Sequence, residues 1–77
     1  MKVSIVVTLK KDVLDPQGKT IMKALKGMNF NNVNEVRQGK YFEIDIEEKN
    51  QKNAEDKAIA MCEKLLANLV IEDYKII

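Results

Sequence analysis

The sequence of 77 residues is long enough for one domain and too short to fill a second hydrophobic core, so residues 1–77 are expected to form a single unit. It is 45% hydrophobic and 32% charged, with three glycines and one proline, which argues against disordered and collagen-like classes. The 13 basic and 12 acidic residues give a net charge of +1, which argues against a general nucleic-acid binder.

The rarest residue types limit the chemistry further. The sequence has no histidine and one cysteine, which excludes Ser-His and Cys-His catalysis within the chain and any zinc site that needs both Cys and His. A single cysteine cannot form an internal disulfide, and no apolar segment is long enough to suggest a membrane span. We therefore expect a cytoplasmic protein with neither a nucleic-acid nor a membrane partner.

The N-terminal half of the sequence predicts a strand followed by a helix. Apolar and polar side chains alternate over residues 2–10, which is typical of a strand with one buried face. Asp15 and Pro16 predict the start of a helix, because aspartate accepts hydrogen bonds from first-turn N–H groups and proline lacks the N–H that would be unpaired there. An apolar stripe extends this helix to about residue 28, namely Ile21, Ala24, Leu25 and Met28. The asparagines at 29, 31 and 32 then predict a turn.

The C-terminal half predicts two further strands around a second helix. Residues 33–38 are a weaker strand candidate, residues 39–40 (Gly-Lys) predict a turn, and residues 41–47 alternate clearly enough for another strand. Asn53 with Asp56 predicts the cap of the second helix, and Asn68 suits a left-handed position at its end. The expected buried side of this helix is the row Ala58, Met61, Cys62, Leu65 and Leu69. Residues 70–77 predict the final strand.

The predicted element order is β-α-β-β-α-β, which favours the α+β class. We expect a single ferredoxin-like domain, an antiparallel sheet with two helices on one face. A core this small rarely supplies more than about 3–5 kcal/mol, so self-association is expected to add stability. Val6 on the polar strand face and the apolar end at Ile76 and Ile77 favour contacts through strand edges and the outer sheet face.

Three carboxylates share the outer face of the strand at residues 41–47, namely Glu43, Asp45 and Glu47. Clustered carboxylates can hold Mg²⁺ or Ca²⁺, but alternation produces such a face in any half-buried strand. A solvated face, paired with Lys2 and Lys10 if the first strand is its neighbour, is therefore the favoured interpretation. The same acids argue against an RNA-binding platform on this face.

Other charged or reactive side chains have similar alternatives. Cys62 lies on an apolar stripe with no cation nearby, which indicates a buried hydrophobic residue rather than a nucleophile. The lysines of the first helix, Lys19, Lys23 and Lys26, indicate a solvated face, or else electrostatic docking. Arg37 is the only arginine, and it is either ordinary surface or a bidentate contact to a carboxylate or phosphate.

Four segments carry a resemblance to a known family. They are residues 13–18 (VLDPQG), 36–40 (VRQGK), 62–68 (CEKLLAN) and 70–74 (VIEDY). Together, in register and over nearly the whole chain, they resemble the PurS family, the small subunit of phosphoribosylformylglycinamidine synthase in de novo purine biosynthesis.

This resemblance implies a reaction performed by a complex. A large synthetase subunit would use ATP and Mg²⁺ to activate the amide oxygen of formylglycinamide ribonucleotide, and a glutaminase subunit would release ammonia from glutamine. The present chain would support assembly and ammonia transfer, with no catalytic residue, metal or cofactor of its own. It would also self-associate as a dimer or tetramer.

We expect partner contacts at the turn carrying Arg37, Gly39 and Lys40, because turns present polar groups and glycine allows close backbone approach. A second contact is expected at four residues of the first helix start: Asp15, Pro16, Gln17 and Gly18. The main alternative is a free-standing ferredoxin-like module of the ACT type that senses an amino acid at a dimer interface. A weaker one is an acylphosphatase-like enzyme on the same fold.

Overall fold

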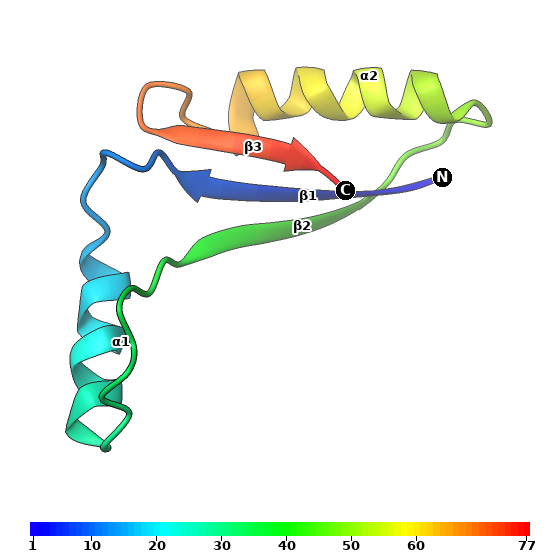
Figure 1. Ribbon diagram of the computed structural model, residues 1–77. Coiled ribbons are helices and arrows are strands. Elements are labelled where there is room, and N and C mark those ends of the chain that lie inside the picture. The colour runs from blue at the N-terminus through cyan, green and yellow to red at the C-terminus, as the bar shows by residue number, and fades with distance from the viewer.

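The computed structural model describes residues 1–77 as a three-stranded sheet with two α-helices and one π-helical turn (Figure 1). In chain order the elements are β1 (Lys2–Leu9), α1 (Pro16–Gly27), β2 (Gly39–Asp45), α2 (Gln51–Met61), η1 (Cys62–Leu66) and β3 (Glu72–Ile76). The strand order is β2-β1-β3, and both pairs are antiparallel. The predicted α+β class, with two helices and an antiparallel sheet, is confirmed, but the sheet has three strands and not four.

The central strand β1 separates an apolar sheet face from a polar one. Val3, Ile5 and Val7 point to the inner face and are buried, as the alternation predicts. On the outer face β1 and β2 are neighbours, and Lys2 lies 3.9 Å from the Glu43 carboxylate. The N-terminal ammonium lies 3.4 Å from Asp45. The strand face is therefore solvated, with Glu43 and Asp45 near Lys2 and the N-terminus, and such exposed ion pairs stabilise little. The predicted part of Lys10 and Glu47 is wrong, because β1 ends at Leu9 and β2 at Asp45.

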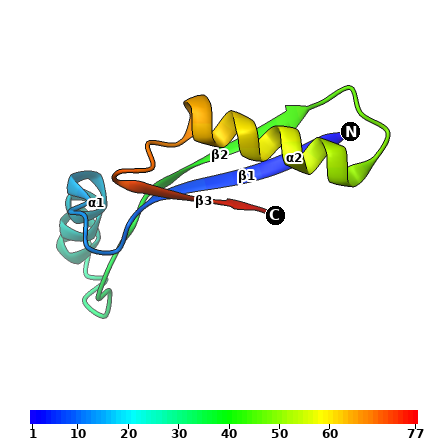
Figure 2. The same cartoon turned by 90° about the horizontal axis from the view of Figure 1, so that it is seen from above.

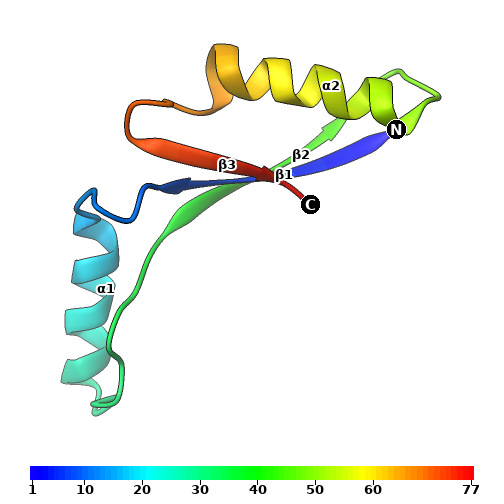
Figure 3. The same cartoon turned by 45° about the horizontal axis from the view of Figure 1, so that its top comes forward.

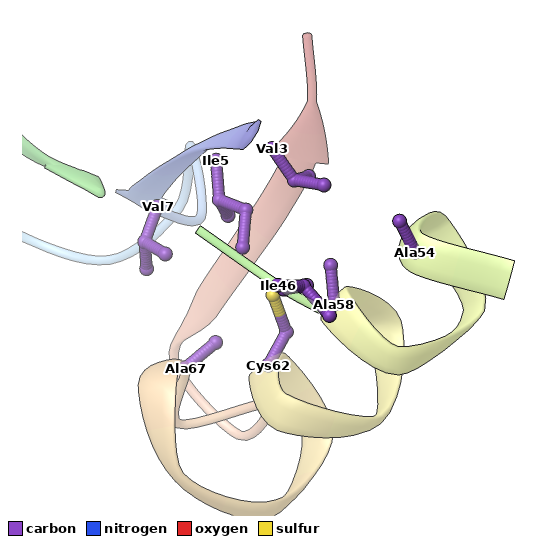
Figure 4. Packing of buried hydrophobic residues seen from close by; sticks show 8 residues of the cluster. All are labelled: Val3, Ile5, Val7, Ile46, Ala54, Ala58, Cys62 and Ala67. Carbon is purple, nitrogen blue, oxygen red and sulfur yellow. The ribbon is translucent and has the colours of Figure 1, made fainter. Parts of the chain in front are cut away.

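The helix α2 covers the inner face of the sheet through small side chains. Ala54, Ala58 and Cys62 recur every four residues, so they share one side of the helix, and all three are fully buried. They pack toward β1 and the end of β2 (Figure 4). The full buried cluster is Val3, Ile5, Val7, Ile46, Ala54, Ala58, Cys62 and Ala67. Small residues on the helix allow its backbone to lie close to the sheet.

The ends of α2 differ from their predicted positions. The cap is Asn50, whose Oδ1 accepts hydrogen bonds from the N–H groups of Lys52 and Asn53, so Asn53 is not the cap. At the other end the helix widens into η1, closed by the N–H of Ala67 donating to the carbonyl of Cys62. This turn leads the chain away, so Leu65 is 83% exposed and the predicted burial of Leu65 is wrong.

The loop after η1 also corrects two predictions. Leu69 is 45% exposed instead of buried. Asn68 is not left-handed, since Asn29 is the only non-glycine residue with positive φ, at 74°. The side chain of Asn68 instead accepts a hydrogen bond from the N–H of Val70 and stabilises the loop before β3. Asn29 lies in the predicted turn after α1.

The helix α1 does not lie on the sheet, although both helices were predicted on one face. It projects from one end of the strands and has no packing interface with any strand (Figures 2 and 3). Of its predicted apolar stripe, Ile21, Ala24 and Met28 are exposed. The radius of gyration is 15.9 Å, whereas a compact domain of this length would have about 11–12 Å. The chain is therefore elongated, with α1 as an arm.

The segment that returns from α1 to β2 is not a strand, although residues 33–38 were predicted as a weak one. It runs beside α1, where Val33 and Val36 are half-buried. No strand of the sheet pairs with it, and the N–H of Gln38 donates instead to the Asp15 carboxylate at the start of α1. Gly39 and Lys40, predicted as a turn, instead begin β2. None of the helices combines the length and apolar character needed to cross a membrane.

Candidate functional site

The residues predicted to contact a partner meet where the arm joins the sheet. We call this junction the elbow, and it consists of residues 9–18 and 36–40. The chain passes through it twice, outward from β1 and back into β2 (Figure 3). It contains every residue of the predicted contact site: Asp15, Pro16, Gln17, Gly18, Arg37, Gly39 and Lys40. Two segments separated by the whole arm are thus brought together, and their contact with a partner stays a prediction.

Asp15 joins the two passes through its carboxylate. Its Oδ1 accepts a hydrogen bond of 3.0 Å from the N–H of Gly18, which makes it the cap of α1 as predicted. Its Oδ2 accepts one of 2.8 Å from the N–H of Gln38 on the returning segment. These N–H groups, with that of Gln38 first, hold the pKa of the Asp15 carboxyl below its ordinary value, with a further contribution from Arg37. The carboxylate is buried and has both oxygens engaged.

Arg37 joins the same two passes in the opposite sense, from the returning segment to the outgoing one. Its Nη1 donates to the carbonyl of Val13 at 3.2 Å. Its Nη2 donates to the carbonyls of Lys10 at 2.8 Å and Leu9 at 3.4 Å. The planar guanidinium thus holds three carbonyls, one at the end of β1 and two in the bend that follows it. Its side chain is exposed, and the predicted contact with a partner carboxylate stays a prediction.

Both elbow glycines lie against backbone of the other pass. A Cβ on Gly18 would be 2.1 Å from the carbonyl oxygen of Val36, and one on Gly39 would be 2.6 Å from that of Val7. Real side chains do not approach backbone so closely, so glycine is required at both positions for the observed packing. The close approach predicted for Gly39 is thus made to β1 of its own chain.

Glu72 is an elbow neighbour that the sequence pattern did not single out. Its carboxylate lies 3.4 Å from the Lys40 ammonium and accepts a 2.7 Å hydrogen bond from the N–H of Asn68. The Asn68 N–H, followed by Lys40, holds the pKa of Glu72 below its ordinary value. An open cavity of about 200 Å³ lies between this pair and Asp15, and the amides of Gln17 and Gln38 line it beside the charged groups.

The remaining candidates for chemistry stay apart. Burial, and after it the negative charge of Glu63, raise the pKa of the Cys62 thiol, so the thiolate form is disfavoured. No three Cys, Asp or Glu side chains converge closely enough to hold a metal ion, the row at 43, 45 and 47 included. What the structure does show in the elbow is a set of hydrogen bonds that holds the two passes of the chain against each other.

Comparison with known proteins identifies close relatives over the whole chain. A family model described as "PurS: Phosphoribosylformylglycinamidine (FGAM) synthase" matches residues 2–77. The phosphoribosylformylglycinamidine synthase subunit PurS of Bacillus subtilis is 51% identical over 74 residues, which is 96% of this chain and 87% of the relative. That of Methanocaldococcus jannaschii is 45% identical over 75 residues, or 97% and 90% of the two chains.

Solved structures agree with this match. The crystal structure of M. jannaschii PurS has a TM-score of 0.88 at 46% identity, covering 99% of this chain and 92% of that one. A chain in the structure of PurLQS from Thermotoga maritima has a TM-score of 0.87 at 29% identity, covering 100% and 96%. The projecting arm and the elbow fall within the matched regions.

Proposed function

Since the chain belongs to the PurS family of phosphoribosylformylglycinamidine synthase subunits, we propose that it serves purine biosynthesis as a non-catalytic subunit of that complex. Its part is to support assembly of a large synthetase subunit with a glutaminase subunit, and the transfer of ammonia between them. The observation that carries this proposal is the match, over the full chain, to a component of the T. maritima PurLQS structure. Nothing in the fold specifically favours the ligand-sensing alternative.

The residue chemistry supports a structural rather than a catalytic part. The sequence has no histidine, its only cysteine is buried, and the elbow presents amides, carbonyls and paired charges. ATP and Mg²⁺ belong, in this proposal, to the large synthetase subunit. The residues present here do not fit either group, because the carboxylates do not cluster and no glycine-rich phosphate loop occurs. The cytoplasm is the proposed location, in keeping with a single, buried cysteine that forms no disulfide within the chain.

Self-association is the second part of the proposal, and the exposed arm supports it. The apolar stripe of α1 includes Ile21 at 39% and Met28 at 66% exposure, beside Phe30 at 52%. The inner face of the sheet is only partly covered, because α2 packs on β1 and β3 and leaves Phe42 and Ile44 of β2 half-buried. The apolar stripe of α1, which no sheet covers, and the apolar strip of β2, which no helix covers, are complementary surfaces.

A second copy of this chain is the occupant that fits both surfaces. The arm of one copy would lie on the β2 strip of the other, beside α2, and the reverse contact would form by the same symmetry. Each copy would then have two helices on one sheet face, as the ferredoxin-like prediction requires. This is a different surface from the strand edges and outer face expected from the sequence.

Reconstitution with the other two subunits tests the function. The chain alone should neither hydrolyse glutamine nor turn over ATP, whereas glutamine-dependent product formation should require it together with both enzymatic subunits. Co-elution of the three components in size-exclusion chromatography is the parallel measurement. ATP turnover by the rigorously purified chain, or full glutamine-dependent synthesis in its absence, would contradict the proposal.

The self-association is tested on the arm itself. Ile21→Asp places a charge on the exposed stripe, and Lys23→Asp places the same group on the opposite side of α1 as the matched control. By light scattering at tens of micromolar, the native chain and Lys23→Asp should be dimeric or larger, and Ile21→Asp should be monomeric. A monomeric native chain, or equal behaviour of the two variants, would count against the arm as the interface.

A further inference from the structure

The direction of the arm is fixed by polar contacts in the elbow, and by little else. The helix α1 has no packing interface with the strands. What connects its first turn to the sheet is a set of short backbone-directed contacts made by four consecutive residues, 36–39. Each of these residues touches the outgoing pass: Val36 at Gly18, Arg37 at residues 9–13, Gln38 at Asp15, and Gly39 at Val7.

These contacts restrain both passes of the chain through the elbow. The Asp15 carboxylate holds the first turn of α1 and the returning N–H of Gln38 at once, so the helix start cannot rotate without breaking one of the two hydrogen bonds. The Arg37 guanidinium holds the bend between β1 and α1 at three carbonyls. Gly18 permits backbone contact with Val36 that any side chain would prevent.

We propose that Asp15, Gly18 and Arg37 form a clamp that fixes α1 away from the sheet of its own chain and so keeps the inner sheet face free for a second copy. The three residues are positioning residues, acting on the arm rather than touching the partner. The purpose of the clamp rests on the proposed self-association, whereas the contacts that form the clamp all lie within one chain. A pre-set arm lowers the ordering cost of association, because an interface element that is already fixed loses less entropy on binding.

The charge state of the carboxylate agrees with this role. The N–H groups of Gln38 and Gly18, and then Arg37, lower the pKa of Asp15, which favours the ionised form that accepts both hydrogen bonds. Arg37 is the charged side chain that acts on it across the elbow.

The test measures the arm's direction within one chain. Spin labels are placed at exposed positions on the arm tip and the far end of the sheet, through Asn31→Cys and Glu47→Cys, with Cys62 left buried. Labelled chains are diluted into a large excess of unlabelled native or variant chain, so that only distances within a chain are recorded by double electron–electron resonance. The native chain should give one narrow distance distribution.

Breaking the clamp should widen that distribution and weaken association. We expect broad distributions in Asp15→Ala, Gly18→Ala and Arg37→Ala, with self-association about tenfold weaker. Arg37→Lys, which keeps the charge without the planar fork, should lie in between and covers the case in which a harsher variant does not fold. Lys23→Ala, exposed on the arm and outside the elbow, is the matched control. Far-ultraviolet circular dichroism and cooperative unfolding establish that each variant compared is folded.

The outcomes separate this proposal from the one on which it rests. Narrow native-like distributions in folded Asp15→Ala and Arg37→Lys would overturn the clamp, and weakened association in those same samples would return both residues to the role of direct partner contacts. A monomeric native chain with broadened variant distributions would support the clamp while removing the proposed self-association.

Discussion

The two helices are of similar length and differ in what holds them. The helix α2 buries Ala54 and Ala58 on the sheet, and Cys62 at the start of η1 continues the same fully buried side. The helix α1 has larger apolar side chains, of which Ile21 is exposed, as is Met28 at its C-terminal cap. Burial in a single chain therefore does not follow hydrophobic content. The buried positions of α2 are small residues, whereas large side chains of α1 stay exposed, which is what the proposed contact with a second copy requires.

The attachments of the helices differ in the same way. The helix α2 is held by apolar packing, which is non-directional and distributed over many side chains. The helix α1 is held at one end by directed hydrogen bonds to Asp15 and from Arg37. Packing should therefore dominate the global stability, while the elbow should govern orientation. The predictions that follow separate these two kinds of attachment.

The largest expected effect is the truncation of a side chain beneath α2. Ile5 is fully buried, so Ile5→Ala should lower the free energy of unfolding by about 2–5 kcal/mol. The same truncation on the arm, Ile21→Ala, should change it by less than about 1 kcal/mol in dilute solution, where association does not contribute. Urea titrations over a range of protein concentrations measure both. Equal losses at the lowest concentration would mean that α1 packs within its own chain.

Overfilling the contact between α2 and the sheet should have the next largest effect. Ala58 is fully buried and Ala60, on the same helix, is exposed. Ala58→Leu should destabilise the chain by about 1–3 kcal/mol because the close approach of the helix leaves no space. Ala60→Leu, with the same change in volume and helix propensity, is the control and should be near neutral. Thermal unfolding of the pair decides whether tight packing holds α2.

The cap of α2 should contribute about 1 kcal/mol. Asn50→Ala removes the oxygen that accepts from the N–H groups of Lys52 and Asn53. Asn53→Ala removes a side chain that the sequence pattern favoured as the cap but that contributes only its backbone N–H to this hydrogen bond. Its effect on the urea midpoint should be clearly smaller. The reverse order would place the helix start at Asn53.

The smallest effect is a pH dependence confined to the arm. The folded pKa of Asp15 lies below its ordinary value of 3.8. The stabilisation from its ionised form is therefore complete above that value and is lost as pH falls through the lower folded pKa. Asn50, the corresponding cap of α2, does not titrate.

Thermal unfolding of the native protein and of Asp15→Asn across the acid range isolates the contribution of the Asp15 carboxylate to stability. The pKa values of Glu48 and Glu72 are also lowered, but these two residues titrate in both proteins. The native chain should lose more stability than the variant on acidification. If the native protein and Asp15→Asn lost the same stability on acidification, the elbow would not hold the Asp15 carboxylate.

Local signals in the sequence predicted local structure well. The alternation over residues 2–10 gave β1, and Asp15 followed by Pro16 gave the start of α1, because each depends on neighbouring residues alone. The placement of α1 could not be predicted, since an apolar stripe indicates which side of a helix can be buried but not whether the sheet of the same chain covers it. The fourth strand was wrong because residues 33–38 lie beside α1 instead of another strand.

The candidate site was located from the sequence but its internal contacts were not. Asp15 and Arg37 were singled out by residue type and by family resemblance, and the structure brings them into one elbow. The acceptors of Arg37 are backbone carbonyls, which every residue carries, so no side-chain pattern could reveal them. Glu72 was missed for a related reason, because its partner Lys40 is 32 positions away in the chain and on the other edge of the sheet.

The elongated outline of the chain also determines how it moves through water. Its extents are 49 × 24 × 14 Å for a mass of 8.8 kDa. A body of this shape experiences more translational friction than a sphere of equal mass, so a single copy diffuses slowly and elutes early from a sizing column. If two copies lay their arms on each other, the pair would be rounder than either one. Friction per unit mass would then fall on association, and the sedimentation coefficient would rise more steeply than mass alone requires.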